Sequence, residues 1–175
     1  MDEVLIKAIV DNNYLIKPMT ILNRNEIKKL YDLCSDYHIM SSGKNATDED
    51  VDNIFKYNDK KTAENSLTLG VYNECELLIG MVDIFKNYPE EDTWMIGLLL
   101  LSPEERNKNL GKIIHEEVKN YALSQGVNTL RIGVMEENIK GKRFWDSLGY
   151  KKIKSTTIDM GDKKHNLDIL ILSIK

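Results

Sequence analysis

The sequence contains 175 residues, which is enough for one domain with a core of its own. Its hydrophobic fraction of 42% is ordinary for a globular protein, and its net charge of -4 argues against general nucleic-acid binding. No apolar run is long enough to span a membrane, the first residues do not read as an export signal, and the two cysteines lack metal-ligand spacing. We therefore expect a cytoplasmic protein in a reducing compartment, with no metal site and no membrane or nucleic-acid partner.

Local patterns in the first half of the chain predict a strand, two helices and an antiparallel hairpin. The first helix has apolar residues at helical spacing from Ile27 to Cys34, and the second begins at a capping-box sequence that starts at Thr47. The hairpin has a polar turn between two apolar strands. The N-terminal extension, residues 1–13, contains an apolar stretch over 4–10 that fits either a helix or a strand. The expected ranges are 14–19 for the strand, 25–37 and 47–55 for the helices, and 67–72 with 77–85 for the hairpin.

The second half predicts alternating strands and helices followed by a final hairpin. The first of these strands is apolar at nearly every position, as in a central strand covered on both faces. The strand–helix–strand unit that it opens predicts a right-handed parallel crossover. The expected ranges are 93–101, 129–135, 150–160 and 166–174 for the strands, and 110–124 and 139–148 for the helices. We therefore predict one α/β domain over residues 1–175, with a mixed sheet of about seven strands flanked on both faces by about four helices, in the order β-α-α-β-β-β-α-β-α-β-β.

The loop between the strand that ends at residue 101 and the next helix is rich in basic and turn-forming residues. A helix start leaves backbone N–H groups without partners and carries partial positive charge, so a tight loop at this place can hold phosphate. Asn107, Asn109 and Gly111 stand at alternate positions and belong to the residue types that best tolerate positive φ. The loop therefore predicts a polyphosphate socket, with a plain helix entry as the alternative. Its basic side chains are Arg106, Lys108 and Lys112.

The helix expected over residues 139–148 has two features that need an explanation. Asn138 stands at its N-cap position, just after a strand. Gly141 lies inside the helix, where glycine costs about 1 kcal/mol relative to alanine, and it leaves one helix face bare for a close approach. An amphipathic helix closed by Gly149 is the alternative interpretation, but it gives no reason for Gly141.

Taken together, these two segments resemble the GNAT superfamily of acyl-CoA-dependent N-acyltransferases, and the resemblance covers about residues 14–174. The phosphate-binding pattern of that family is Arg or Gln, two residues, Gly, one residue, and then Gly or Ala. Arg106, Asn109 and Gly111 occupy these positions here, so asparagine replaces the first glycine. The second family signature is matched by Asn138, Gly141, the aromatic pair Phe144-Trp145 and the pair Gly149-Tyr150.

The resemblance implies that acetyl-CoA enters between the parallel strands expected at 93–101 and 129–135. Backbone amides of the loop would hold its diphosphate, strand backbone and Asn138 would bond its pantetheine arm, and the aromatic pair would pack near its thioester. A lysine of the second signature would reach a phosphate. The cofactor-binding residues implied in this way are Leu99, Leu100, Leu101, Arg106, Asn107, Lys108, Asn109, Leu110, Gly111, Lys112, Asn138, Gly141, Lys142, Phe144 and Trp145.

The reaction implied by the resemblance is direct attack of an amine on the thioester within a ternary complex. The N–H of Leu99, at a strand bulge near Gly97, is expected to stabilise the oxyanion. Asp92 is the candidate general base, acting through water, with Glu91 and Asp83 as alternatives. Trp145 stands where many family members have a tyrosine that protonates the leaving thiolate, and an indole N–H is not a usable acid.

The acceptor is expected to be the primary amine of a small molecule or a peptide. Tyr37, His38 and Phe55 fall in the region where the family builds its acceptor pocket, and core packing is the alternative role for them. The departure at Trp145 and the lack of a carboxylate within 93–101 also motivate a second hypothesis, a non-catalytic acyl-CoA-binding module. The chain is expected to be a monomer or a homodimer.

Overall fold

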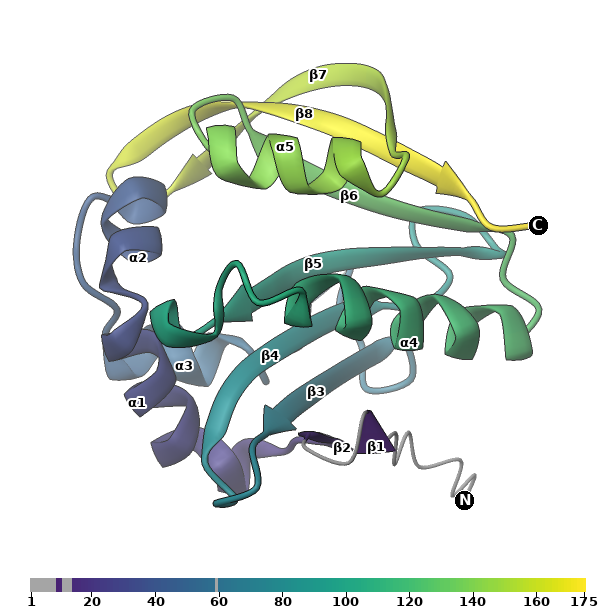
Figure 1. The fold of residues 1–175 in the computed structure, drawn as a ribbon. Coiled ribbons are helices and arrows are strands. Elements are labelled where there is room, and N and C mark those ends of the chain that lie inside the picture. Colours follow the sequence, from purple (N-terminus) through teal and green to yellow (C-terminus); the bar gives the residue numbers. More distant parts are fainter. Residues whose placement is uncertain (1–8, 11–13, 59) are drawn as a thin grey trace.

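The computed structural model describes residues 9–10, 14–58 and 60–175. These residues form one sheet of eight strands in the order β1-β2-β3-β4-β5-β6-β8-β7 (Figure 1). The seven predicted strands are all present in the predicted order. The additional strand, β1 (Ile9–Val10), pairs antiparallel with β2 (Tyr14–Pro18). The remainder of the expected N-terminal extension lies outside the described residues, including positions 4–8 of its apolar stretch.

The strand pairing makes a mixed sheet, as predicted. The central strand β5 pairs antiparallel with β4 on one side and parallel with β6 on the other, which confirms the parallel arrangement expected for the strand–helix–strand unit. Two antiparallel hairpins, β3–β4 and β7–β8, lie in the two halves of the sheet. The bounds are Ser66–Tyr72 for β3, Leu78–Phe85 for β4, Thr93–Leu101 for β5, Thr129–Met135 for β6, Lys151–Met160 for β7 and Lys163–Ser173 for β8.

The described part of the chain contains five α-helices, close to the predicted number of about four, because one predicted helix is divided in two. A single helix was expected over residues 25–37, but α1 ends at Leu33 and α2 begins at Ser35. Cys34 between them has a ψ of 30°, outside the helical range, and its thiol donates to the carbonyl of Leu101 on β5 at 3.3 Å. The helices are α1 (Arg24–Leu33), α2 (Ser35–Ser42), α3 (Asp48–Asn53), α4 (Leu110–Ser124) and α5 (Ile139–Ser147).

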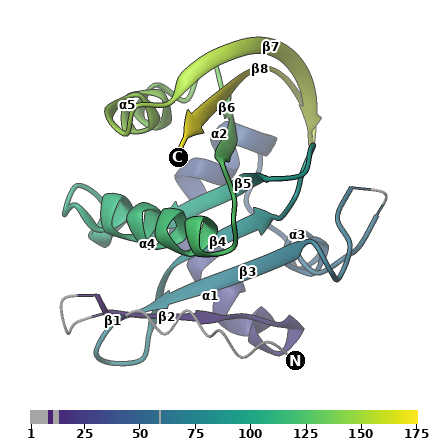
Figure 2. The same cartoon turned by 90° about the vertical axis from the view of Figure 1, so that its right-hand side faces the viewer.

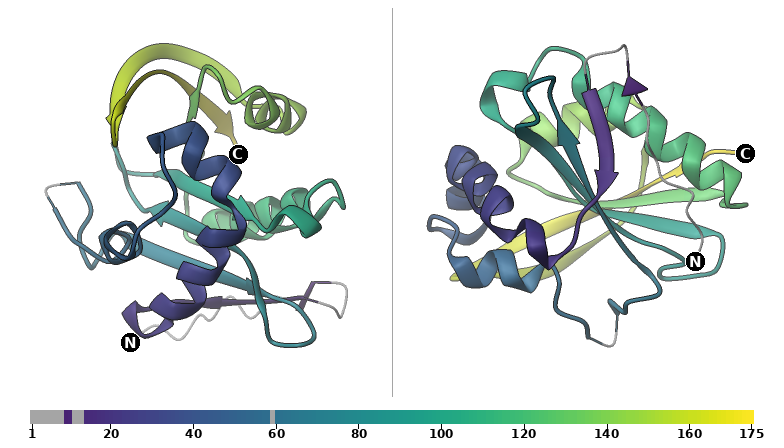
Figure 3. Two further views of the ribbon diagram at one scale, coloured as in Figure 1. Left: turned by 90° about the vertical axis from the view of Figure 1, so that its left-hand side faces the viewer. Right: turned by 90° about the horizontal axis from the view of Figure 1, so that it is seen from below.

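The helices cover both faces of the sheet, so two hydrophobic cores form. Helices α1 and α3 pack on one face, and α4 and α5 pack on the other (Figure 3). The predicted capping box at the start of α3 is present, with the Thr47 hydroxyl accepting from the Asp50 N–H. Across the described residues, no helix combines the length and apolar character that a membrane span requires.

Strand β7 is the last strand of the sheet and lies at its edge. Its residues from 151 to 159 are exposed, and Figure 2 shows the β7–β8 hairpin curling away from the rest of the sheet. The pairing register with β8 shifts between Lys152 and Lys154, which leaves Ile153 in a β-bulge. Lysines and a bulge on an edge strand are features that disfavour pairing with a further strand.

Candidate active site

Strands β5 and β6 pair over a short distance and then separate. Their pairing runs from Thr93–Thr129 to Ile96–Ile132, whereas β5 continues to Leu101. The two strands diverge toward their carboxyl ends, where α2 lies (Figure 1). We call residues 97–101 of β5 and 133–135 of β6 the splay. Because these segments do not pair with each other, the edge of each one carries backbone groups that β-sheet pairing leaves unused.

The pairing with β4 shows which backbone groups of β5 turn toward the splay. The Ser102 N–H donates to the Ile79 carbonyl at 2.8 Å, and the register opposes Leu101 to Gly80 and Leu99 to Val82. Hydrogen-bonded and non-bonded pairs alternate in an antiparallel ladder, so Leu99 and Leu101 direct their N–H and C=O groups away from β4. Leu100, predicted beside them, instead directs its backbone groups toward β4.

The β-bulge expected near Gly97 is present. The register passes from Asp83–Leu98 to Ile84–Ile96, so Gly97 is an extra residue on β5. A glycine is needed here, because a Cβ atom would lie 2.6 Å from the ring of Phe85. Bulges redirect neighbouring groups, and this one lies two residues before Leu99.

The loop before α4 presents consecutive backbone donors. Asn107 and Asn109 have φ values of 61° and 67°, as the pattern predicts, and no described group accepts from the N–H groups of residues 107–111. Gly111 has a different role from the one predicted, because its φ is not positive. A Cβ atom at this position would lie 3.2 Å from the ring of Phe144 on α5, so the glycine allows α4 and α5 to approach closely. Leu110 is buried at the base of the loop.

The basic residues of this loop do not all face the same way. The Arg106 guanidinium donates to the Leu101 carbonyl at 3.0 Å and forms a two-fold ion pair with Asp36 on α2. This pairing holds the pKa of Asp36 below its usual value. Lys108 lies 3.7 Å from Glu105, and Lys112 is exposed. Arg106 therefore braces the loop against α2, while the two lysines line its outer side.

Asn138 and Gly141 act together at the start of α5. The Asn138 side-chain oxygen accepts from the Gly141 N–H at 2.9 Å, which caps the helix. A Cβ atom at Gly141 would lie 2.6 Å from that same side chain. The close approach that we expected at Gly141 is therefore made by the Asn138 cap itself, and the amide nitrogen of Asn138 is left as a donor.

The remaining predicted residues of α5 point in different directions. Phe144 packs over Gly111, beside the loop. Trp145 is buried in an aromatic cluster with His115 and Tyr150. The Lys142 ammonium pairs with the buried Asp168 at 3.0 Å, and the structure does not bring it to the loop. Hydrogen bonds from Lys152 and Lys142 lower the pKa of Asp168 to about 2.

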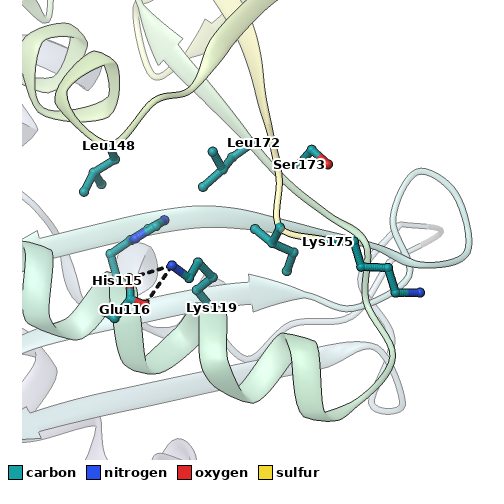
Figure 4. Close-up of a pocket in the computed structure, with 8 residues that line it drawn as sticks. His115, Glu116, Lys119, Leu148, Leu172, Ser173 and Lys175 are labelled. Atoms are coloured by element: carbon teal, nitrogen blue, oxygen red, sulfur yellow. Dashed lines mark hydrogen bonds and ion pairs between the residues drawn. The ribbon is translucent and has the colours of Figure 1, made fainter.

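His115 lies on the buried side of α4, next to Trp145 of α5. Its Nε2 atom lies 3.0 Å from the Tyr150 hydroxyl, and burial lowers its pKa to about 4, so it is neutral at pH 7. Figure 4 shows its ring above α4, where it lines a pocket of about 260 Å³ between α4, the end of α5 and the end of β8. The other residues that line this pocket are Glu116, Lys119, Leu148, Leu172, Ser173, Ile174 and Lys175.

The predicted acceptor residues lie together on the opposite face of the sheet. Tyr37 and Phe55 pack against the core beneath α1 and α3, and the rings of Tyr37 and His38 are 5.5 Å apart. His38 is buried, and burial lowers its pKa, so it too is neutral at pH 7. Its Nε2 atom has no hydrogen-bond partner within the described residues.

Of the candidate bases, Asp83 lies beside the splay, opposite Leu98 in the β4–β5 register, and Asp92 lies away from it. Asp92 precedes β5 and Leu99 lies seven residues further, which is about 23 Å along an extended strand. The Asp92 backbone carbonyl accepts from the N–H groups of Asn128 and Thr129, and its carboxylate accepts from the Asn128 side-chain amide at 3.4 Å. Asp83 is buried, with one carboxylate oxygen 2.8 Å from the Lys61 ammonium and the other accepting from Thr68.

Sequence reasoning missed the residues that position α2. Asp36 pairs with Arg106 across 70 positions, and His165 on β8 bonds the Ser41 carbonyl across 124 positions. Neither pair leaves a local signal in the sequence, because no periodicity or motif links residues so far apart. Long-range polar pairs of this kind are found through the fold.

The comparisons with known proteins agree with this geometry. The acetyltransferase (GNAT) family model matches residues 27–150. An acetyltransferase from Thermus thermophilus has a TM-score of 0.74 at 20% identity, with 91% of this chain and 96% of that chain covered. An N-acetyltransferase from Staphylococcus aureus has a TM-score of 0.69 at 16% identity, with 93% and 99% covered.

A third similar structure contains ligands. The spermidine N-acetyltransferase from Vibrio cholerae, in complex with CoA and spermine, has a TM-score of 0.71 at 12% identity, with 93% of this chain and 96% of that chain covered. No curated protein matches the sequence. The matched family model spans most of the chain and includes the splay, the loop before α4 and the capped start of α5, and on this basis the chain belongs to the GNAT family of acetyltransferases.

Proposed function

We propose that the protein transfers the acetyl group of acetyl-CoA to the primary amine of a small molecule or a peptide, by direct attack within a ternary complex. One observation carries this proposal. Backbone groups of the splay that β-sheet pairing leaves unused stand at one end of β5, and the free amides of residues 107–111 follow at the start of α4.

These residues fit the parts of CoA in order. The amides of residues 107–111 suit a diphosphate, because each donates a hydrogen bond and the helix start adds positive potential. The backbone of Leu99 and the N–H of Leu101 suit an extended amide-containing arm, which would pair with β5 as a further strand does. The Leu101 carbonyl already accepts from Cys34 and Arg106. The free amide nitrogen of Asn138 is a third donor on the β6 side. When bound, acetyl-CoA supplies an activated acetyl thioester.

The chain contributes to the reaction by binding and orienting the substrates. It also directs one hydrogen-bond donor toward the acyl group. The Leu99 N–H faces the splay beside the bulge at Gly97, where it can donate to an acyl oxygen. Asp92 lies far from this point and Asp83 is already paired with Lys61, so neither carboxylate is placed to take the proton directly. We propose that the amine loses its proton to water and reaches the site uncharged.

A non-catalytic acyl-CoA-binding module is the second candidate function. Trp145, which replaces the usual tyrosine, is buried among aromatic rings and has no acidic hydroxyl to offer. This observation favours a module only if the reaction requires an acid from α5. Release of the CoA thiolate does not demand one, because it is a good leaving group.

The test combines calorimetry with CoA and a turnover assay with acetyl-CoA. The amine panel contains spermidine, spermine, lysine and a short peptide with a free N-terminus. Binding with thiol release for at least one amine supports the enzyme, binding without release across the panel supports the module, and absence of binding contradicts both.

A pair of variants at Gly111 places the cofactor. Gly111→Asp adds a negative charge beside the free amides and should weaken CoA binding by at least about 100-fold. Gly111→Ala, the matched control, adds only the Cβ atom 3.2 Å from the Phe144 ring and should have a smaller effect. Equal effects of the two substitutions would show that packing, and not phosphate recognition, depends on this position.

A further inference from the structure

Helix α2 lies across the open end of the splay and is held there at both ends (Figures 1 and 3). At its start, the Cys34 thiol donates to the Leu101 carbonyl of β5, and Asp36 pairs with Arg106 of the loop before α4. At its end, the Ser41 carbonyl accepts from His165 of β8, in the other half of the sheet. Helix α2 therefore connects β5, on one side of the splay, with β8, on the other side.

The contacts of His165 require a positive charge on its ring. Its Nδ1 atom lies 2.5 Å from a Glu137 carboxylate oxygen, and its Nε2 atom lies 2.6 Å from the Ser41 carbonyl oxygen. Both partners can only accept, so both ring nitrogens must donate, and a neutral imidazole has one N–H to give. The ring is only 2% exposed, so water does not replace either contact easily.

A second cation strengthens the same anchor. The Lys163 ammonium donates to the carbonyls of Ile39 and Met40 at 2.9 and 3.0 Å. Three consecutive carbonyls at the end of α2 are thus bonded to two cationic side chains from β8. A helix end carries partial negative charge, so cations are favoured there.

We propose that His165 is a positioning residue, whose imidazolium fastens the end of α2 across the splay and thereby sets the affinity for the acceptor more than the affinity for CoA. The inference rests on the proposed function only in naming an acceptor amine as the ligand. His165 acts through α2, which carries Tyr37 and His38, and it does not contact the loop that we assign to CoA.

The charged groups around His165 make the fastening dependent on pH. Glu137 faces it from the turn before α5, and Lys163 faces it from its own strand. On α2, Asp36 is occupied by Arg106 at the other end and His38 is neutral, and the β7 residue opposite His165 is Ile158. The hydrogen bonds to Glu137 and Ser41 raise the pKa of His165 above its ordinary value.

The sign of this dependence follows from that raised pKa. The stabilisation is complete below the unfolded-state pKa of His165, about 6.5, and is lost as the pH rises through the folded-state value. The pKa of Glu137 is lowered, so its contribution is lost only in acid. We therefore expect α2 to be fastened at weakly acidic pH and released as the pH rises through the folded-state pKa of His165.

Amide hydrogen exchange of the ligand-free protein is the primary test, with rates corrected for the intrinsic effect of pH. His165→Gln keeps a donor for Ser41 but loses the second donor and the charge. It should lower protection of the α2 amides by about tenfold at pH 7.

A second variant tests the role of Glu137. Glu137→Gln keeps an acceptor and removes the carboxylate charge. As the pH rises, protection of the α2 amides should therefore be lost at a lower pH than in the wild type. Lys164→Gln is the matched control, because Lys164 is the exposed neighbour of His165 and should leave α2 unchanged.

Two further measurements separate this inference from the proposed function. In His165→Gln, KM for the amine turned over in the panel should rise by a larger factor than the Kd for CoA measured by calorimetry, and kcat should change less than KM. Unchanged α2 protection in His165→Gln, or an unshifted transition in Glu137→Gln, would overturn the inference even if the enzyme is active. If α2 protection changes in the variants as expected but no amine is turned over, only the proposed function is contradicted.

Discussion

Two buried histidines show how local surroundings decide charge at the scale of single residues. His115 has one neutral partner, the Tyr150 hydroxyl, and burial lowers its pKa to about 4. His165 has a carboxylate and a carbonyl as partners, and these raise its pKa. The pKa values of two rings that are both 2% exposed therefore move in opposite directions. Burial alone does not predict the protonation of a histidine, because its hydrogen-bond partners also count.

The lowered pKa of His115 gives a pH-dependent stability of definite sign. A histidine whose pKa falls on folding stabilises the protein above its unfolded-state value, near 6.5, and this stabilisation is lost as the pH falls toward 4. His115→Gln does not titrate. We expect the stability deficit of His115→Gln relative to wild type to shrink between pH 7 and pH 5, as measured by urea unfolding. A constant deficit would show that folding does not lower the pKa of His115.

The conformation of Asn109 predicts an asymmetric response to substitution. Its φ of 67° lies in the left-handed region, which glycine adopts freely and β-branched residues avoid. Asn109→Val should cost about 1–2 kcal/mol of stability and weaken CoA binding, whereas Asn109→Gly should keep both near wild type. Chemical denaturation and calorimetry measure the two effects. Similar losses in both variants would mean that the asparagine side chain, and not the backbone, matters.

At the scale of elements, patterned segments were predictable and long-range contacts were not. The alternation of apolar strands and amphipathic helices gave every strand of the GNAT core and the order of the elements. The separation of α1 from α2 had no signal, because Cys34 continues the apolar spacing and its thiol bonds a strand residue far along the chain. The free amides and the positive φ of Asn107 and Asn109 followed from residue type, while the pairing of Arg106 with Asp36 required the fold.

The ion pair between Lys61 and Asp83 joins the segment after α3 to strand β4. Both side chains are buried, and the Lys61 ammonium also bonds the Ile54 carbonyl. Lys61→Met leaves a buried carboxylate without its cation and should cost about 3–5 kcal/mol of unfolding free energy. The matched control is Lys60→Met at an exposed neighbouring position, which should stay within about 0.5 kcal/mol of wild type in the same denaturation experiment. A small loss in Lys61→Met would mean that Asp83 takes up a proton when its partner is removed.

At the scale of the whole molecule, the sheet consists of two parts joined by a short parallel contact. Four residue pairs, from Thr93–Thr129 to Ile96–Ile132, connect strands β1–β5 with strands β6, β8 and β7. The two cores on either face and helix α2 supply the other connections. A ligand that pairs with the splay would add a connection that the protein lacks on its own.

This arrangement predicts a marked thermal stabilisation by CoA. A ligand present at 100 times its dissociation constant adds about 2.7 kcal/mol, which corresponds to a rise of roughly 5–10 °C in Tm for a domain of this size. Scanning calorimetry with CoA measures the rise. ADP, which has a diphosphate but no pantetheine arm, should give a smaller rise at the same concentration. Equal shifts with the two ligands would mean that the arm adds nothing and that the splay is not its site.

The anchoring of α2 also has a consequence for how the protein is made. Arg106 follows Asp36 by 70 positions and His165 follows Ser41 by 124 positions. A chain leaves the ribosome from its N-terminus, so α2 emerges long before either of its partners exists. Docking of α2 is therefore a late event of biosynthesis, and the nascent enzyme stays uncovered at this end until β8 has been translated.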